Sequence, residues 1–117
     1  MARAVRLELA SGAAVCERCL VADNPWSRLR GLLGRGGLPA GEGILLRPCS
    51  SVHTTFMRFS IDVVFCDGDL RVLSVVPELR PWRFAAKRGA KVTIELAAGE
   101  AATRGVEAGA QLRTVDA

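Results

Sequence analysis

The sequence predicts a single, mostly β domain, folded as a compact antiparallel barrel or sandwich of six or more short strands with one clear short helix. Short segments in which apolar and polar residues alternate are spread along the chain, and turn residues separate them. Only one stretch has the three- and four-residue apolar spacing of an amphipathic helix. The 117 residues are the usual size of one domain, and the apolar half of the chain is sufficient for one core, so no cofactor is predicted.

The predicted strands follow from this alternation and from the turns between them. Residues 5–9 alternate strictly, and residues 14–22 follow after a Ser-Gly turn. Residues 44–46 form a short apolar run that ends before Pro48. The strongest β signal, at residues 61–66, leads through an Asp-Gly turn into residues 70–76, which predicts a hairpin. Residues 91–96 and 111–115 are expected to be the last strands, with one helical turn at residues 99–104.

The predicted helix lies in the segment that follows the second strand. Asn24 is suited to the N-cap and Pro25 to the first helical position, where its missing N–H is not needed. Gly34 can adopt the left-handed conformation that ends a helix. The expected apolar stripe consists of Trp26, Leu29 and Leu33.

A long loop is expected at residues 77–89, between two predicted strands. It contains Trp82 and Phe84, and large aromatic side chains are rarely left in water, so we expect this loop to cover apolar surface. Phe56, Met57 and Phe59 are likewise expected in the core.

The composition favours a cytoplasmic protein. Charged residues at positions 3, 6 and 8 interrupt the apolar run that a secretory signal requires, and no apolar stretch approaches the roughly 20 residues of a membrane-spanning helix. Four cysteines in such a chain are expected to be reduced thiols.

The charge gives little indication of a partner. The net charge of +4 comes almost entirely from arginine, and the basic residues are scattered without interleaved aromatic residues. Nucleic acid is therefore not the expected partner, and neither is a membrane.

Four groups of residues stand in order along nearly the whole chain: residues 28–35 (RLRGLLGR), His53-Thr54 with Met57-Arg58, residues 61–65 (IDVVF), and Ile94-Glu95-Leu96 with Gly99, Gly105 and Gly109. In this order and spacing the chain resembles the bacterial and archaeal family catalogued as domain of unknown function number 192. The resemblance implies a small, mostly β fold and does not imply a particular activity.

Cys16 and Cys19 have the spacing of a redox pair or of half a zinc site, and Cys49 with His53 would complete four ligands. In a regular strand, however, side chains three positions apart point to opposite faces. Buried thiols without metal are the preferred interpretation.

His53 is the only histidine and lies in a polar segment between two apolar strands. Hydroxyl residues surround it and Arg58 follows, which favours a binding loop over a structural role only narrowly. A Ser-His-Asp triad with Ser50 or Ser51 is disfavoured, because the Gly-x-Ser-x-Gly motif is absent.

Asp62 stands within the apolar run at residues 61–66, so its carboxylate must be paired or face a pocket. The expected partner is an arginine, either Arg58 or one of Arg28 and Arg30. A structural ion pair and a functional role are equally favoured.

Arg28, Arg30 and Arg35 lie on or just after the predicted helix, beside a glycine-rich loop that could receive a carboxylate or phosphate. A solvated helix face is the alternative.

Three functional hypotheses remain open. The first is a non-enzymatic binding module that takes a small polar or anionic ligand or a peptide in a pocket between residues 53–62 and residues 28–35. The second is a hydrolase or other enzyme that uses His53 and Asp62 as acid and base, with or without a metal. The third is an interaction protein whose partner covers the Trp82 and Phe84 loop. The first ranks above the second, because the sequence has no recognisable nucleophile.

Overall fold

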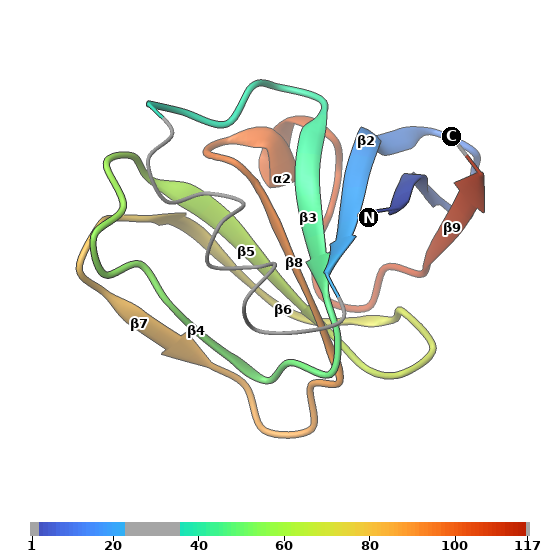
Figure 1. Ribbon diagram of the computed structural model, residues 1–117. Coiled ribbons are helices and arrows are strands. Elements are labelled where there is room, and N and C mark those ends of the chain that lie inside the picture. Colours follow the sequence, from blue (N-terminus) through green and yellow to red (C-terminus); the bar gives the residue numbers. More distant parts are fainter. Residues whose placement is uncertain (1–2, 23–35, 117) are drawn as a thin grey trace.

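The computed structural model describes residues 3–22 and 36–116, and it confirms the predicted mostly β fold (Figure 1). The strands are β1 (Arg3–Leu9), β2 (Ala14–Ala22), β3 (Glu42–Leu46), β4 (Ser51–His53), β5 (Ile61–Cys66), β6 (Val72–Leu79), β7 (Phe84–Ala86), β8 (Val92–Ala97) and β9 (Leu112–Asp116). A short helix, α2 (Glu100–Thr103), confirms the helical turn expected at residues 99–104. The helix expected at residues 25–34 lies outside the described residues, as do Arg28, Arg30 and Arg35.

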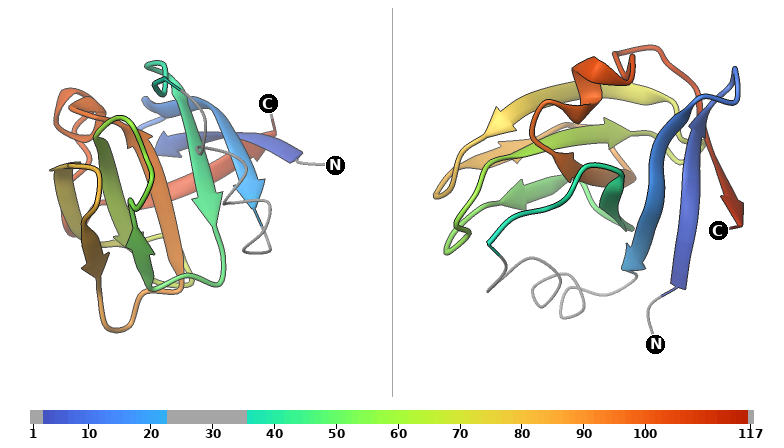
Figure 2. Two further views of the ribbon diagram at one scale, coloured as in Figure 1. Left: turned by 60° about the vertical axis from the view of Figure 1, so that its left-hand side comes forward. Right: turned by 90° about the horizontal axis from the view of Figure 1, so that it is seen from above.

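Seven strands form one curled sheet in the order β6-β5-β8-β3-β2-β1-β9, which Figure 2 shows as an open half-barrel. A bridge between Arg71 and Gln111 brings the first residues of the two edge strands together. The amide of Val72 also donates to the carbonyl of Ala110 at 2.8 Å. The sheet therefore nearly closes at this end.

One pair in this sheet differs from the antiparallel arrangement expected from the sequence. β2 and β3 are parallel, whereas the other neighbouring strands of the sheet run antiparallel. A parallel pair needs a long crossover connection. The residues between the ends of β2 and β3 supply that length, while the other connections are short.

The hairpin predicted at residues 61–76 is confirmed. β5 and β6 pair antiparallel, and the Asp67 carboxylate accepts hydrogen bonds from the amides of Asp69 at 2.9 Å and Arg71 at 3.0 Å. These hydrogen bonds from the turn's own backbone to the Asp67 side chain explain why an Asp-Gly sequence favours the turn between β5 and β6.

The main sheet has an apolar core on each face. The interior of the curl holds side chains from all seven strands, including Leu7, Leu45 and Ile94. The outer face carries a second cluster with Ile61, Val63 and Phe65, and β4 contributes Val52 to it. Because both faces are covered, β5 is buried along its whole length. The strand expected at residues 91–96 is confirmed as β8, and its polar residues Thr93 and Glu95 are buried as well.

β4 and β7 form a separate two-stranded sheet that covers the outer face. His53 pairs with Phe84, and Val52 with Ala85. The interpretation of residues 77–89 as one long loop is therefore wrong. Each of these strands has only three residues, too few for an alternation pattern to be visible in the sequence.

None of the helices among the described residues is long and apolar enough to cross a membrane.

Candidate functional site

The carboxylate of Asp62 is fully buried, as its apolar neighbours predicted, but its partners differ from the expectation. Oδ1 accepts hydrogen bonds from the amides of Glu78 at 2.8 Å and Gly99 at 3.1 Å, and Oδ2 accepts one from the amide of Ala101 at 2.8 Å. Arg58 forms no ion pair with it, and the other two expected arginines, Arg28 and Arg30, lie outside the described residues. Backbone amides satisfy the charge instead, which joins the end of β6 to α2.

His53 and Asp62 lie on opposite sides of the main sheet. Side chains alternate along β5, so Asp62 shares the interior face with Val64, whereas Ile61 and Val63 face the outer cluster. β4, which carries His53, covers that outer cluster. The hypothesis of an acid–base pair made of His53 and Asp62 is therefore wrong, and the same geometry separates the members of the Ser-His-Asp triad.

The cysteines are all buried, and a β-bulge changes the expected geometry of the first pair. Val5 pairs with Cys19 and Leu7 with Cys16, so β2 has one more residue than β1 at this point. Both thiols consequently face the interior, which corrects the expectation that they point to opposite faces. Their contact lowers the pKa of Cys16 and raises the pKa of Cys19.

Cys49 belongs to the other core, on the outer face of the sheet, and His53 is exposed. The four low-ranked metal candidates, Cys16, Cys19, Cys49 and His53, are therefore distributed over different faces. In residues 3–22 and 36–116, no three His, Cys, Asp or Glu side chains come together in a group that could hold a metal ion.

A cluster of exposed aromatic side chains stands on the small sheet and its loops. Phe56 is 68% exposed, Trp82 59% and Phe84 68%, and they are three of the four large apolar side chains exposed in the described part of the chain. The rings of Phe56 and Trp82 are 4.7 Å apart between centroids and meet edge to face. Residues 77–89 do cover apolar surface, through Leu79 and Ala85, although Trp82 and Phe84 themselves are exposed. The expectation that Phe56 lies in the core is wrong, whereas Met57 and Phe59 do pack there.

Two of these aromatic residues have an unfavourable backbone conformation. Phe56 has φ 68° and Trp82 has φ 63°, in the left-handed region that costs about 1 kcal/mol or more for a residue other than glycine. Glycine would be less strained at these two positions, and burial of the aromatic rings does not compensate for the strain, because both rings are exposed. Such strain is retained only where the surrounding structure imposes it.

Thr54 imposes it. Its side chain is fully buried, and its hydroxyl donates to the carbonyl of Arg80 at 2.6 Å and accepts from the amide of Arg83 at 2.8 Å. The Thr54 carbonyl accepts from the amides of Met57 at 3.1 Å and Trp82 at 3.0 Å. One threonine thereby fixes the loop that carries Phe56 and the loop that carries Trp82.

The net positive charge of the chain is confined to the two segments that build this sheet. Residues 47–60 and 78–91 contain seven basic residues and one acidic residue, a net charge of +6. The rest of the chain contains nine basic and eleven acidic residues, a net charge of −2. All seven basic side chains of the two segments are exposed.

We call the exposed side chains of this sheet and its loops the aromatic–basic surface: His53, Phe56, Arg58, Arg80, Trp82, Arg83, Phe84, Lys87 and Arg88. In Figures 1 and 2 the β4–β7 sheet lies on the side of the molecule away from β1, β9 and both termini. Of the predicted site residues, the surface includes His53 and Arg58. It excludes Asp62.

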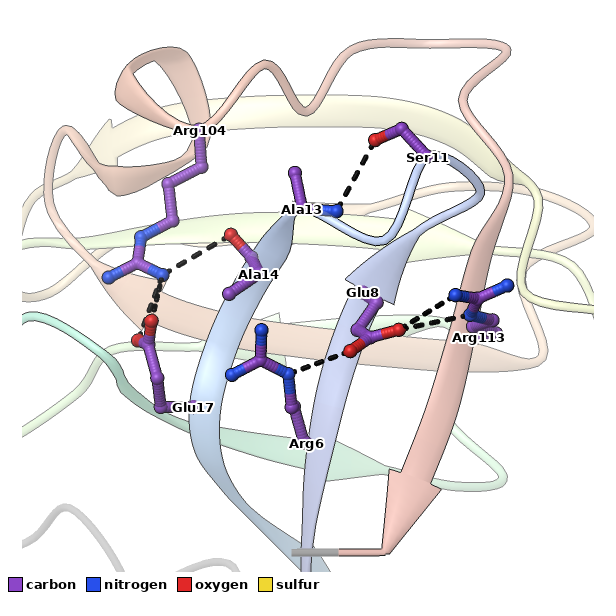
Figure 3. A network of polar contacts seen from close by, with 8 residues as sticks. All are labelled: Arg6, Glu8, Ser11, Ala13, Ala14, Glu17, Arg104 and Arg113. Carbon is purple, nitrogen blue, oxygen red and sulfur yellow. Dashed lines mark hydrogen bonds and ion pairs between the residues drawn. The ribbon is translucent and has the colours of Figure 1, made fainter.

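Three arginines on β1, on β9 and after α2 are paired with carboxylates, and Figure 3 shows their contacts with Glu8 and Glu17. Glu8 binds Arg6 at 2.8 Å and Arg113 at 2.9 Å, and Arg104 binds both Glu17 and Glu100 at 2.8 Å. These contacts lower the pKa of the Glu8 and Glu17 carboxyls and raise that of Arg104. Among the described residues, by contrast, no carboxylate forms an ion pair with the basic residues of the aromatic–basic surface.

Sequence reasoning considered Trp82 and Phe84 only as a loop that a partner protein covers, and it missed Arg80, Arg83, Lys87 and Arg88 as site residues. The 17 residues at positions 61–77 separate the two segments that meet here. Arg80, Trp82, Arg83 and Phe84 already interleave along the chain, but the whole set of side chains comes together only in the fold. Only the pairing of β4 with β7 reveals the combination.

The profile of the DUF192 family, described as "Uncharacterized ACR", matches residues 7–114. The chain belongs to this family. The match confirms the resemblance seen in the sequence and covers both segments of the aromatic–basic surface. It assigns no activity.

Curated DUF192 relatives from archaea carry the name UPF0127 protein. The one from Pyrococcus furiosus is 37% identical over 97 residues, which are 78% of this chain and 81% of the relative. The one from Thermococcus sibiricus is 37% identical over 87 residues, 70% of this chain, and this match spans only 56% of the relative's length.

Two solved structures share the DUF192 fold seen here. A protein from Sinorhizobium meliloti named as a candidate transcription regulator has a TM-score of 0.82 and 22% identity, with 97% of this chain and 94% of that chain covered. A protein of unknown function from Novosphingobium aromaticivorans has a TM-score of 0.79 and 21% identity, with 96% and 84% covered. At these identities the likeness shows the fold alone.

Proposed function

We propose that this DUF192 chain is a binding module that takes an anionic ligand on the aromatic–basic surface. The observation that carries the proposal is the coincidence, on one small sheet, of the exposed aromatic cluster with all of the chain's net positive charge.

The basic side chains supply the attraction. Guanidinium groups bind carboxylate and phosphate oxygens in a bidentate way, and four arginines contribute to this surface. Because they have no carboxylate partner in the described structure, binding an anion would not require an existing ion pair to break.

The aromatic side chains supply contact area. Exposed aromatic rings that gather in one place are typical of binding surfaces rather than of ordinary solvated surface. The left-handed backbone of Phe56 and Trp82 supports the same conclusion, since strain of this kind clusters at functional sites. In this proposal His53, which is exposed and pairs with Phe84, contacts the ligand and does not act as a catalytic base.

Retention on immobilised heparin, a sulfated polysaccharide, tests the proposal. We expect the wild-type chain to be retained, and the double variant Arg80→Glu/Arg83→Glu to elute at a much lower salt concentration. The matched control is Arg3→Glu/Arg18→Glu, which changes the net charge equally at two exposed positions on β1 and β2. If both variants lose retention equally, only the overall charge matters and the proposal is wrong.

A further inference from the structure

We infer that the ligand of the aromatic–basic surface is single-stranded nucleic acid. This inference rests on the proposed function and names the class of ligand. Each nucleotide of such a strand offers one flat base and one phosphate, and the surface offers exposed rings beside unpaired cations in the same combination.

The rings are available for stacking. Phe56 and Trp82 touch edge to face, and both remain more than half exposed, so most of their surface is open to a flat partner. Thr54 holds the two loops in place, so little conformational freedom remains to be lost when a base stacks. Phe84 adds a third ring on the neighbouring strand.

The exposed rings favour a single strand over a duplex. In a duplex the bases already stack on one another and present only their edges in the grooves. Three aromatic rings that project into water match unpaired bases, whose faces are free.

An acidic peptide is the competing ligand, and it would satisfy the arginines equally well. It carries no obligatory flat group for each negative charge, so it gives no reason for three large rings to be exposed, two of them on a strained backbone. The charge alone does not separate the two ligands, but the rings favour the nucleic acid.

Fluorescence anisotropy with a labelled deoxythymidine 12-mer tests this assignment, with poly-glutamate of equal charge and a duplex of equal length as competitors. We expect the single strand to bind, and neither competitor to displace it at equal concentration. The affinity should fall with rising salt concentration with a logarithmic slope of about −2 to −3, which corresponds to three or four phosphates.

Trp82→Ala is the decisive variant. Loss of one stacked base should weaken oligonucleotide binding by roughly 5- to 100-fold and weaken heparin retention far less, because heparin has no flat base to stack, and Trp82→Phe should restore most of the binding. Val115→Ala, at an exposed apolar residue of β9, is the matched control and should change neither. Thermal unfolding of each variant checks that it remains folded.

The outcomes separate this inference from the proposed function. Heparin retention that depends on Arg80 and Arg83, with poly-glutamate binding as tightly as the oligonucleotide, would support the proposed function and overturn the nucleic-acid assignment. An unchanged affinity of Trp82→Ala for the oligonucleotide would overturn it as well. Binding of neither heparin nor the oligonucleotide would contradict both.

Discussion

Asp62 accepts three backbone hydrogen bonds, and these bonds explain why a carboxylate stands in a strand that is otherwise apolar. The sequence predicted that the residue is buried and partnered, because an unpaired charge is costly among apolar side chains. It could not predict the partners. The donors are the amides of residues 78, 99 and 101, and every residue other than proline has an amide, so their side chains give no signal.

We predict that Asp62→Ala lowers the free energy of unfolding by about 3 kcal/mol, because three amide donors lose their acceptor in an environment from which water is excluded. Asp62→Asn keeps one acceptor oxygen and should cost less. Urea denaturation measures both variants against the wild type. A loss below about 0.5 kcal/mol for the alanine variant would show that water reaches this position.

At the scale of the elements, the longer strands were predictable and the small sheet was not. β1, β2, β5 and β8 were predicted with bounds within two residues at each end, because alternation over five or more residues is visible in a sequence. β4 and β7 have three residues each and pair across about 30 residues of chain. The bulge in β2 could not be predicted from the sequence either, because it depends on the register of β2 with β1.

The hydrogen bonds of Thr54, which join the loop of Phe56 to the loop of Trp82, determine the geometry of the candidate site more than any other contact among the described residues. We predict that Thr54→Val, which removes the hydroxyl at nearly constant volume, destabilises the protein by about 1–3 kcal/mol, because the Arg83 amide loses the hydroxyl as an acceptor and the Arg80 carbonyl loses its donor. Heparin retention should fall as the two loops loosen. Thr54→Ser, which keeps the hydroxyl, should behave like the wild type in denaturant melts and on heparin. A valine variant with wild-type stability would show that this link does not hold the loops.

At the scale of the whole molecule, the fold class was predictable from the sequence but the distribution of charge over the surface was not. Scattered arginines and a net charge of +4 indicated no particular partner. In the fold Arg6, Arg104 and Arg113 pair with carboxylates, whereas the four arginines of the aromatic–basic surface, which have no such pair, lie around β4 and β7. The basic and aromatic side chains therefore form one continuous surface only in the folded chain.

Mapping the binding face by NMR tests the central claim most directly. In a titration of the ¹⁵N-labelled wild-type chain with a heparin hexasaccharide, we predict the largest amide shifts at His53, Phe56 and residues 80–88, with little change on β1 and β9. Shifts concentrated on β1, β2 or β9, or spread evenly over the molecule, would contradict the assignment of the aromatic–basic surface as the binding site.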